Sequence, residues 1–418
     1  MPHIMRTVRV AALCCVALST LPLVASAETY HWLQYGPDGL EARAITDQAA
    51  CPVAEIDGVQ SAMTVRAAPG ERYPITVCAL PISAGAKSAS IANVPLVFPA
   101  SEPKRIAVIG DTGCRLKGSA VQACNDPQQW PFRLIAEVVA QLKPDLVIHV
   151  GDYHYRETPC PAGIAGCAGS PFGDNWVVWR VDFFAPADTL LKVAPWVFVR
   201  GNHEECDRGG QGWSRTLEPY AFDAAKGCNG VGKPLIVRLP GLALAVMDVS
   251  SAREEKLDEA QASLFREQYR SLALASAGPT WILQHRPIWS PGGTFSGMLV
   301  GDNKTLAVAA SDMIPDNVTL ILSGHHHLFQ LLNYQSNLPV QIVSGNSGDA
   351  LNPGAPTDPA GWVVNGITVK SGLHMAGSFG FSMFEKQNGG WQLTNYDRLG
   401  IARTSCVIKE RAATCPPN

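Results

Sequence analysis

The sequence has few charged residues and no excess of positive charge. Of its 418 residues, 33 are Lys or Arg and 36 are Asp or Glu, which gives a formal net charge of −3. Surfaces that bind nucleic acid normally carry a basic stripe or face, so no nucleic-acid partner is expected. The content of 46% hydrophobic and 17% charged residues is typical of a globular chain rather than a disordered one.

The sequence also lacks a hydrophobic run long enough to span a membrane. Its N-terminal apolar stretch, residues 10–24, is too short and is broken by Pro22. Two arginines precede this stretch and Ala-Ser-Ala follows it at 25–27, so residues 1–27 are expected to be a signal peptide. Its two cysteines lack the small preceding residues of a lipoprotein signal. We therefore expect a secreted or periplasmic protein with no membrane span after signal removal.

No Cys-x-x-Cys pair follows the leader, which argues against a metal held by cysteines. The chain has twelve cysteines, and removing the two in the leader leaves ten. An even number in an exported chain favours disulfides. The sequence does not fix their connectivity. Because each pair of neighbours brackets a loop-like segment, the pairs that we expect are Cys51–Cys78, Cys114–Cys124, Cys160–Cys167, Cys206–Cys228 and Cys406–Cys415.

A second Asp-Thr-Gly or Asp-Ser-Gly motif is missing as well. One Asp-Thr-Gly stands at 111–113. An aspartic protease needs two carboxylates that share a proton, usually from two such motifs. The single copy therefore argues against that class.

Three regions differ in pattern. Residues 28–100 contain short β-type runs and are expected to form a small β-rich N-terminal module. From residue 101 to 418 we expect one α/β catalytic domain, because short, continuous apolar runs alternate with helical segments, as in strands buried on both faces. The expected strands lie at 106–109, 146–150, 196–199, 242–247, 281–283 and 318–322, and the expected helices at 131–142 and 258–275. Further β-type segments follow at 340–344, 380–385 and 391–397.

Polar side chains follow five of these runs at the points where the expected strands end. Functional residues of open α/β sheets lie just beyond the carboxyl ends of strands. Any one such residue is more commonly a turn, a cap or a structural histidine, but their joint occurrence favours a functional site. The residues are Asp111, Asp152, Asn202, His285, His325 and His327.

These side chains are suitable ligands for two metal ions. Ions ~3.5–4 Å apart repel each other and need a carboxylate bridge, for which Asp152 is the candidate. Mixed imidazole and carboxylate ligands suit iron, zinc or manganese. His203 is not needed as a ligand and is the candidate catalytic residue, placed to protonate a leaving oxygen. The first ion would be completed by Asp111 and His327, and the second by Asn202, His285 and His325.

The ordered motifs resemble those of the calcineurin-like metallophosphoesterases. They are Asp-x-Gly, Gly-Asp-x-x-Tyr, Gly-Asn-His-Glu, a lone strand-end His and Gly-His-x-His, within residues 105–330. The tyrosine three places after the second Asp, Tyr155, resembles the purple acid phosphatases in particular. This resemblance implies two mixed β-sheets sandwiched between helices in four layers. It also implies iron(III) held by Asp111, Asp152, Tyr155 and His327, and divalent iron, zinc or manganese held by Asp152, Asn202, His285 and His325.

The same resemblance implies an activity. A metal-bound hydroxide would attack the phosphate of a small-molecule substrate in line, most simply as an acid phosphomonoesterase. A phosphodiesterase, a nucleotidase or a pyrophosphohydrolase would use the same two-metal site and remains the alternative. A metal-binding protein without turnover is the non-enzymatic alternative, and His203 argues against it because a binder has no use for a proton donor.

The chain departs from plant-type members of that family, which carry further histidines soon after the lone-His motif. No histidine lies between His285 and His325. Substrate contacts are therefore expected from Arg156, Arg286 or His326, although the middle histidine of a triplet is more commonly structural. The loop 158–174 is a candidate wall or cover of the site. The sequence does not indicate an oligomeric state.

Overall fold

The computed structural model describes residues 1–3, 29–275, 278–295, 298–354 and 357–416. All but the first three residues of the expected signal peptide lie outside these ranges. Within them, no helix combines the length and the apolar character that crossing a membrane requires.

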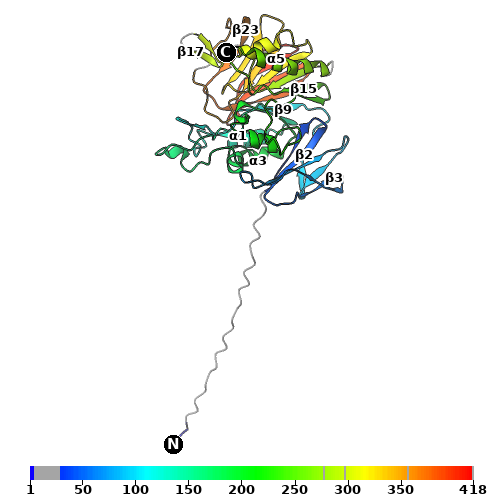
Figure 1. The fold of residues 1–418 in the computed structure, drawn as a ribbon, viewed down its shortest axis with the longest axis vertical. Coiled ribbons are helices and arrows are strands. Elements are labelled where there is room, and N and C mark those ends of the chain that lie inside the picture. The colour runs from blue at the N-terminus through cyan, green and yellow to red at the C-terminus, as the bar shows by residue number, and fades with distance from the viewer. Residues whose placement is uncertain (4–28, 276–277, 296–297, 355–356, 417–418) are drawn as a thin grey trace.

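Two large mixed sheets form the centre of the molecule (Figure 1). The larger has eleven strands in the order β27 (Ala412–Thr414), β26 (Ala402–Lys409), β25 (Gly390–Asp397), β24 (Gly380–Gln387), β9 (Arg105–Ile109), β12 (Leu146–His149), β13 (Trp196–Phe198), β1 (Thr29–Gly36), β2 (Gly39–Thr46), β6 (Thr76–Pro81) and β5 (Thr64–Ala67). The other has eight strands in the order β14 (Leu235–Leu239), β15 (Leu242–Met247), β16 (Thr280–Gln284), β19 (Val318–Ser323), β21 (Val340–Ser344), β20 (Phe329–Tyr334), β23 (Ile367–Met375) and β22 (Val363–Val364).

Each sheet contains a block of parallel strands. In the larger sheet the block is β9, β12 and β13, and in the smaller it is β15, β16, β19 and β21. Every residue of β12, β13, β15 and β16 is buried. This burial explains why these segments read as unbroken apolar runs in the sequence, since parallel strands are covered on both faces.

The helices cover the outer faces of the two sheets. Phe132, Ile135 and Val139 of α1 (Phe132–Gln141) are fully buried and recur at helical spacing, so one face of this helix packs on the larger sheet. The helix α5 (Glu259–Arg270) begins where Asp258 accepts a hydrogen bond from the Gln261 amide at 3.0 Å. The others are α2 (Trp176–Trp179), α3 (Ala185–Leu191), α4 (Gly210–Thr216) and α6 (Lys304–Ala310).

Successive side chains of one strand reach different cores. Ile106 and Val108 of β9 pack between the two sheets against residues such as Leu244 and Leu283, whereas Ile109 packs under α1. The outer face of the smaller sheet packs against α5 and α6. Helices, sheet, sheet and helices therefore form four layers, and the expected fold class is confirmed.

The N-terminal segment contributes to the larger sheet. Strand β1 pairs in parallel with β13, and β2, β6 and β5 extend the sheet beyond it. A separate small sheet packs beside them, in the order β4 (Val59–Ala62), β3 (Val53–Ile56), β7 (Ala89–Ile91) and β8 (Val94–Leu96). The division into a module at 28–100 and a catalytic domain at 101–418 remains a prediction.

Five disulfides connect the described cysteines, and all five expected pairings are confirmed. They are Cys51–Cys78, Cys114–Cys124, Cys160–Cys167, Cys206–Cys228 and Cys406–Cys415.

Candidate metal centre

The carboxyl ends of the two parallel blocks meet at one edge of the molecule. Asp111, Asp152 and Asn202 follow β9, β12 and β13 of the larger sheet, while His285 and the pair His325 and His327 follow β16 and β19 of the smaller one. The site is therefore assembled from both sheets, and neither sheet carries it alone.

The turns after these strands are tight, which explains the glycines of the motifs. Asp111, Asp152 and His325 have positive φ angles of 55°, 61° and 70°, a left-handed conformation that turns the chain sharply after each strand. A Cβ atom on Gly201 would lie 2.1 Å from Oδ1 of Asp152, and one on Gly324 would lie 2.5 Å from Oδ2 of Asp111. A side chain at either glycine would displace a carboxylate of the site.

One group of four side chains gathers around the Tyr155 hydroxyl, which we call the tyrosine half. This oxygen lies 3.0 Å from Oδ1 of Asp111, 2.8 Å from Oδ2 of Asp152 and 3.0 Å from Nε2 of His327. Tyr155, Asp111 and Asp152 are almost completely buried.

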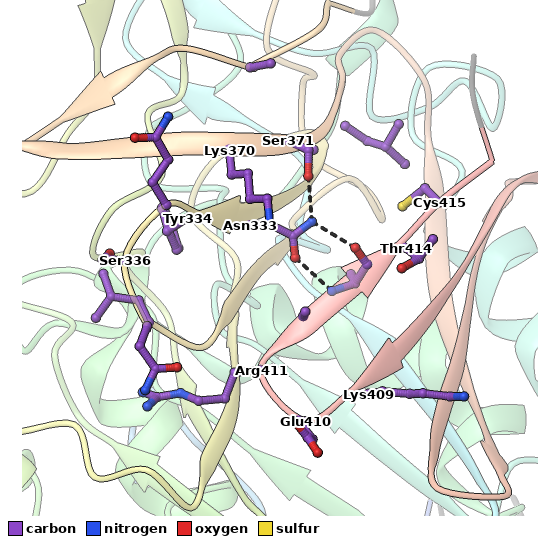
Figure 2. A pocket seen from close by; sticks show the side chains of 18 of the residues that line it. Asn333, Tyr334, Ser336, Lys370, Ser371, Lys409, Glu410, Arg411, Thr414 and Cys415 are labelled. Atoms are coloured by element: carbon purple, nitrogen blue, oxygen red, sulfur yellow. Dashed lines mark hydrogen bonds between the residues drawn. The ribbon is translucent and has the colours of Figure 1, made fainter.

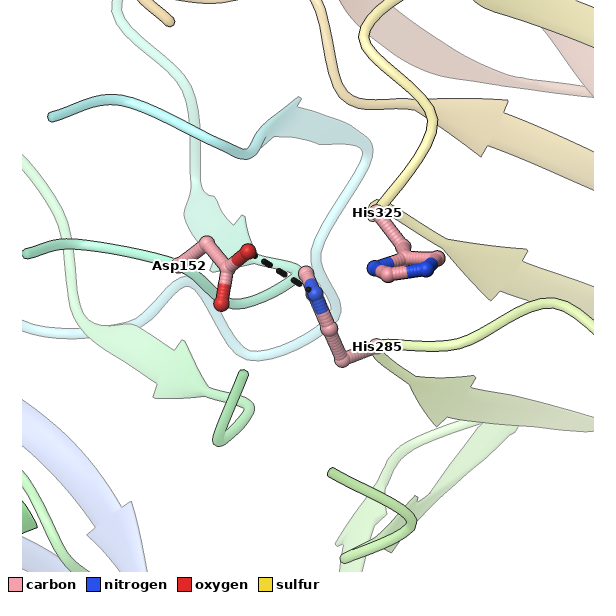
Figure 3. A group of neighbouring side chains, drawn as sticks. All are labelled: Asp152, His285 and His325. Atoms are coloured by element: carbon pink, nitrogen blue, oxygen red, sulfur yellow. Dashed lines mark ion pairs between the residues drawn. The ribbon is translucent and has the colours of Figure 1, made fainter. Parts of the chain in front are cut away.

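The second group, which we call the histidine half, gathers around the Asn202 side-chain oxygen. This oxygen lies 3.0 Å from Nε2 of His285 and 2.8 Å from Nδ1 of His325. Nε2 of His285 is also 3.1 Å from Oδ2 of Asp152. Figure 3 shows Asp152, His285 and His325 converging from three different loops. One possible ligand atom from each of them lies within 4.8 Å of the other two.

One oxygen atom belongs to both halves. Oδ2 of Asp152 lies 2.8 Å from the Tyr155 hydroxyl on one side and 3.1 Å from Nε2 of His285 on the other. The other carboxylate oxygen of Asp152 accepts a hydrogen bond from the His203 amide at 2.8 Å. This arrangement suits a carboxylate that bridges two cations.

The hydrogen bonds outside the cluster determine which ring nitrogen of each histidine faces inward. Nδ1 of His285 is 2.8 Å from the Val150 carbonyl, and Nδ1 of His327 is 2.7 Å from the Ala350 carbonyl. A carbonyl only accepts, so Nδ1 keeps the proton in each ring, and Nε2 presents a lone pair to the cluster once the ring is neutral. For His325 the outer nitrogen is Nε2, 2.7 Å from Glu254. Lone pairs and carboxylates thus converge with too few protons between them, and the donor set fits cations.

The pKa values of the buried groups are shifted in ways that a nearby cation would offset. Burial raises the pKa of the Asp111 carboxyl and, with the neighbouring carboxylates, raises the pKa of Tyr155 well above its usual range. Burial acts to lower the pKa of His285, but the Asp152 carboxylate outweighs it and raises that pKa to about 9. The Tyr155 hydroxyl would therefore lose its proton only if a strongly charged cation lay close to its oxygen.

His203 lies beside both halves. Its ring lies against the Tyr155 ring, tilted by 35° with 3.7 Å between centroids, and its Nε2 is 3.9 Å from Oδ2 of Asp152. Its Nδ1 is 2.7 Å from a carboxylate oxygen of Glu157, which also pairs with Arg208. Burial lowers the pKa of His203 to about 4, against the opposing effects of Asp152 and Glu157.

A pocket of about 420 Å³ opens onto the cluster. Arg115 forms part of its wall, and the loop after β21 contributes residues 350–353. The predicted residues that line it are Asp152, Asn202, His203, His325 and His327.

A larger pocket, of about 1040 Å³, lies between β20, β23 and the β26–β27 hairpin (Figure 2). Asn333 bridges its two sides, donating to the Ser371 hydroxyl at 3.0 Å and pairing with both the amide and the carbonyl of Ala413. None of the predicted ligand residues lines this pocket.

A model of the calcineurin-like phosphoesterase family matches residues 104–329, just over half of the 418-residue chain. The chain belongs to this family.

Two solved structures have a fold similar to that of this chain. A purple acid phosphatase from yellow lupin (Lupinus luteus) seeds is 14% identical with a TM-score of 0.57, over 91% of this chain and 74% of that one. PhoD is 11% identical with a TM-score of 0.55, over 93% of this chain and 91% of that one. At such identities the likeness concerns the fold. No curated protein matches the chain.

The structure places several residues of this phosphoesterase away from the roles considered for them. Arg156 is buried against Asp182 and the Trp130 ring, and is not part of the pocket wall. His326 is buried with Nε2 3.0 Å from the Ser290 carbonyl. The loop 158–174 contributes no residue to the wall of this pocket. Of the three side chains expected to grip substrate, Arg286 remains beside the cluster, with Nη1 3.0 Å from Nε2 of His325.

Other charged residues at the site were not expected from the sequence. Glu204 accepts hydrogen bonds from the Asp152, Tyr153 and His154 amides at 2.8–3.1 Å, so it shapes the turn that carries Asp152. Glu254 contacts His325 and Arg286 at 2.7 and 2.9 Å. Glu204 is the last residue of the motif Gly-Asn-His-Glu, so the sequence did contain a signal for it. Glu254 lies in a surface-like Arg-Glu-Glu-Lys run that gives no such signal.

Proposed function

We propose that this protein is an exported phosphoesterase that uses two metal ions, and that it acts as an acid phosphomonoesterase on a phosphorylated small molecule. The observation that carries the proposal is the position of Oδ2 of Asp152, which lies within 3.1 Å of both the Tyr155 hydroxyl and Nε2 of His285. Membership of the phosphoesterase family supports hydrolysis of a phosphate ester as the chemistry.

In this proposal each half holds one ion. Iron(III) would be held by Asp111, Asp152, Tyr155 and His327, because three oxygen ligands that can carry negative charge suit a hard trivalent ion. A divalent iron, zinc or manganese ion would be held by Asp152, Asn202, His285 and His325. When bound, such a pair lowers the pKa of a coordinated water and clamps a phosphate for in-line attack.

The residues of the chain supply the remaining chemistry. A carboxylate oxygen of Glu157 lies 2.7 Å from Nδ1 of His203, and Nη2 of Arg208 lies 2.8 Å from both ring nitrogens. These two side chains hold the ring with Nε2 near Asp152. From there His203, in its protonated form, would give a proton to the leaving oxygen or stabilise its charge. Disulfides throughout the described chain support an oxidising, extracytoplasmic location.

The test compares an aryl phosphate monoester with the matching diester across pH, on metal-loaded protein, with the Asp152→Asn variant as the inactive control. A monoester preference with an acidic optimum is the expected result. A diester preference or a neutral optimum would assign the site instead to a phosphodiesterase, nucleotidase or pyrophosphohydrolase. Absence of turnover by metal-loaded protein would favour a binding protein without catalysis.

A further inference from the structure

Arg115 is a cation of the pocket wall with no place in the two sets of ligands. Its side chain is 27% exposed, whereas the side chain of its partner Asp349 is fully buried. Nη2 of Arg115 lies 3.4 Å from Nδ1 of His327, and the guanidinium lies 5.4 Å from the centre of the Tyr155 ring. Arg115 therefore stands beside the tyrosine half, at the mouth of the pocket.

Asp349 holds one edge of this guanidinium. Nε of Arg115 lies 3.0 and 3.2 Å from the two carboxylate oxygens of Asp349, and Nη2 also donates to that carboxylate. Among the residues that the structure describes, Nη1 has no hydrogen-bond partner. An arginine that is fixed along one edge and free at the other is prepared to bind an anion with little loss of side-chain freedom.

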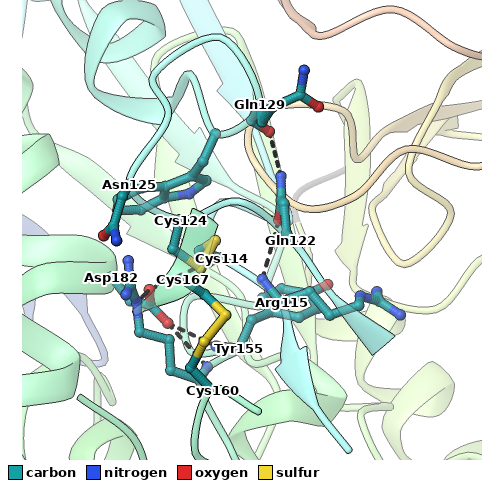
Figure 4. The surroundings of a disulfide bond; sticks show 12 residues. Cys114, Arg115, Gln122, Cys124, Asn125, Gln129, Tyr155, Cys160, Cys167 and Asp182 are labelled. Atoms are coloured by element: carbon teal, nitrogen blue, oxygen red, sulfur yellow. Dashed lines mark hydrogen bonds and ion pairs between the residues drawn. A yellow bond between two sulfur atoms is a disulfide. The ribbon is translucent and has the colours of Figure 1, made fainter. Parts of the chain in front are cut away.

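A disulfide and backbone hydrogen bonds also fix the loop that carries Arg115. The Cys114–Cys124 disulfide closes the loop that carries Arg115 (Figure 4). Within it the Arg115 amide donates to Gln122 at 3.1 Å, and Gln122 donates in turn to the Gly348 carbonyl at 2.9 Å. The Asp349 amide donates to the Asp111 carbonyl at 2.8 Å. Both members of the ion pair are thus tied to the turn that carries a proposed metal ligand.

We propose that Arg115 binds a terminal phosphate oxygen of the substrate and is the residue that favours monoesters over diesters. This inference rests on the proposed function for the position of the phosphate. A monoester has three terminal oxygens and a diester has two, because an ester group replaces the third. A donor beside the ions therefore has an oxygen to bind in a monoester that a diester lacks. Asp349 acts as a positioning residue for Arg115.

The test measures binding of inorganic phosphate to the metal-loaded protein by calorimetry, together with kcat and KM for the matched monoester and diester. Arg115→Ala is expected to weaken phosphate binding about 10- to 100-fold, as loss of a charge-assisted hydrogen bond does. The same variant should raise KM for the monoester much more than it changes kcat, and should affect the diester less. Asp349→Asn should show a weaker form of the same pattern, because it frees the held edge of the arginine. Because Asp349 also lies 3.2 Å from Nδ1 of His327, the metal content of this variant is measured alongside and should be unchanged.

The control is Arg105→Ala. Arg105 pairs with Glu385 at 3.3 Å at the opposite end of β9, and its side chain is 37% exposed. This variant removes the same charge from the same strand-and-loop unit without touching the pocket. Equal phosphate affinity in the two variants would overturn the proposal, as would equal losses on monoester and diester. Arg115→Lys keeps the charge without the fork, so partial retention of phosphate binding shows that a misfolded Ala variant is not the cause.

The two proposals fail in different ways. Phosphate binding that depends on Arg115 in a protein without turnover would support the anion site while removing the enzymatic function. Normal hydrolysis with phosphate affinity unchanged in Arg115→Ala would support the proposed phosphoesterase activity and contradict the proposed role of Arg115.

Discussion

The two halves of the candidate metal centre share one carboxylate but differ in chemistry. The tyrosine half has oxygen atoms from Asp111, Asp152 and Tyr155 and a single imidazole from His327. The histidine half has two imidazoles, the neutral Asn202 oxygen and the same carboxylate. Because hard anionic oxygens favour a hard, highly charged ion, the difference leads us to expect two unlike metals in one site.

Each half contains one histidine that lies against a carboxylate. In the tyrosine half, Nδ1 of His327 is 2.7 Å from the Ala350 carbonyl and 3.2 Å from Asp349. In the histidine half, His285 is oriented by a backbone carbonyl, whereas His325 contacts Glu254, which also holds Arg286. The two carboxylates, Asp349 and Glu254, are therefore positions from which mutation can change one half at a time.

The largest effect is expected where the two halves meet. Asp152→Asn removes the shared negative charge while keeping the size of the side chain. We expect loss of both ions by elemental analysis and a fall in kcat/KM of more than about 100-fold, since even a residue behind a ligand typically costs 10–100-fold. Retention of one ion at full occupancy would show that Asp152 belongs to a single half.

A smaller effect, confined to the tyrosine half, is expected from Tyr155→Phe. The ring stays buried, so the fold is preserved, but the oxygen ligand is lost. Any visible charge-transfer band of the metal-loaded protein should disappear, while the ion of the histidine half remains by elemental analysis. An unchanged band would assign the colour to another ligand. Substitution of Tyr153, a buried neighbour whose hydroxyl donates to the Val199 carbonyl at 2.9 Å, is the matched control and should leave the band in place.

Glu254→Gln tests the histidine half by itself. The amide keeps the shape but weakens the partner of His325, so affinity for the ion of this half should fall about 10- to 100-fold. The measurement is competition with a chelator, following the two ions separately. Glu255→Gln, on the exposed neighbour, should have no effect. Equal loss of both ions in the Glu254 variant would contradict the separation of the halves.

The smallest effect on the site is expected from the disulfides that flank it. Cys114–Cys124 lies beside the tyrosine half, and Cys206–Cys228 follows the turn of His203. A reductant should lower the melting temperature, because each bridge typically contributes about 2–4 kcal/mol, while metal content changes little. Thiol titration in denaturant without reductant should find no reactive cysteine in the mature chain; ten reactive thiols would contradict the pairing.

Much of this architecture was open to prediction because it depends on local rules. Strands buried on both faces must be apolar throughout, so 146–150 and 242–247 were recognisable as strands, and Asp258 was recognisable as a cap. Short loops bring neighbouring cysteines together, which explains why pairing by sequence order succeeded. The segments β1 and β2 were not predicted, because β1 (Thr29–Gly36) is mixed in composition and finds its place only by pairing with β13.

The sequence by itself determined the family, the four-layer class of fold and the set of residues that come together at the strand ends. The resemblance of the ordered motifs implied the family and the four-layer fold, and the apolar runs before the motifs indicated that their polar residues lie at strand ends. The tertiary structure decided which charged side chains support them: Glu254 behind His325, Glu157 behind His203 and Asp349 behind Arg115. These partners are separated by 71, 46 and 234 residues along the chain. Such contacts depend on which strands lie side by side in a sheet and, for Arg115 and Asp349, on how the two sheets stack. No local pattern in the sequence specifies either arrangement.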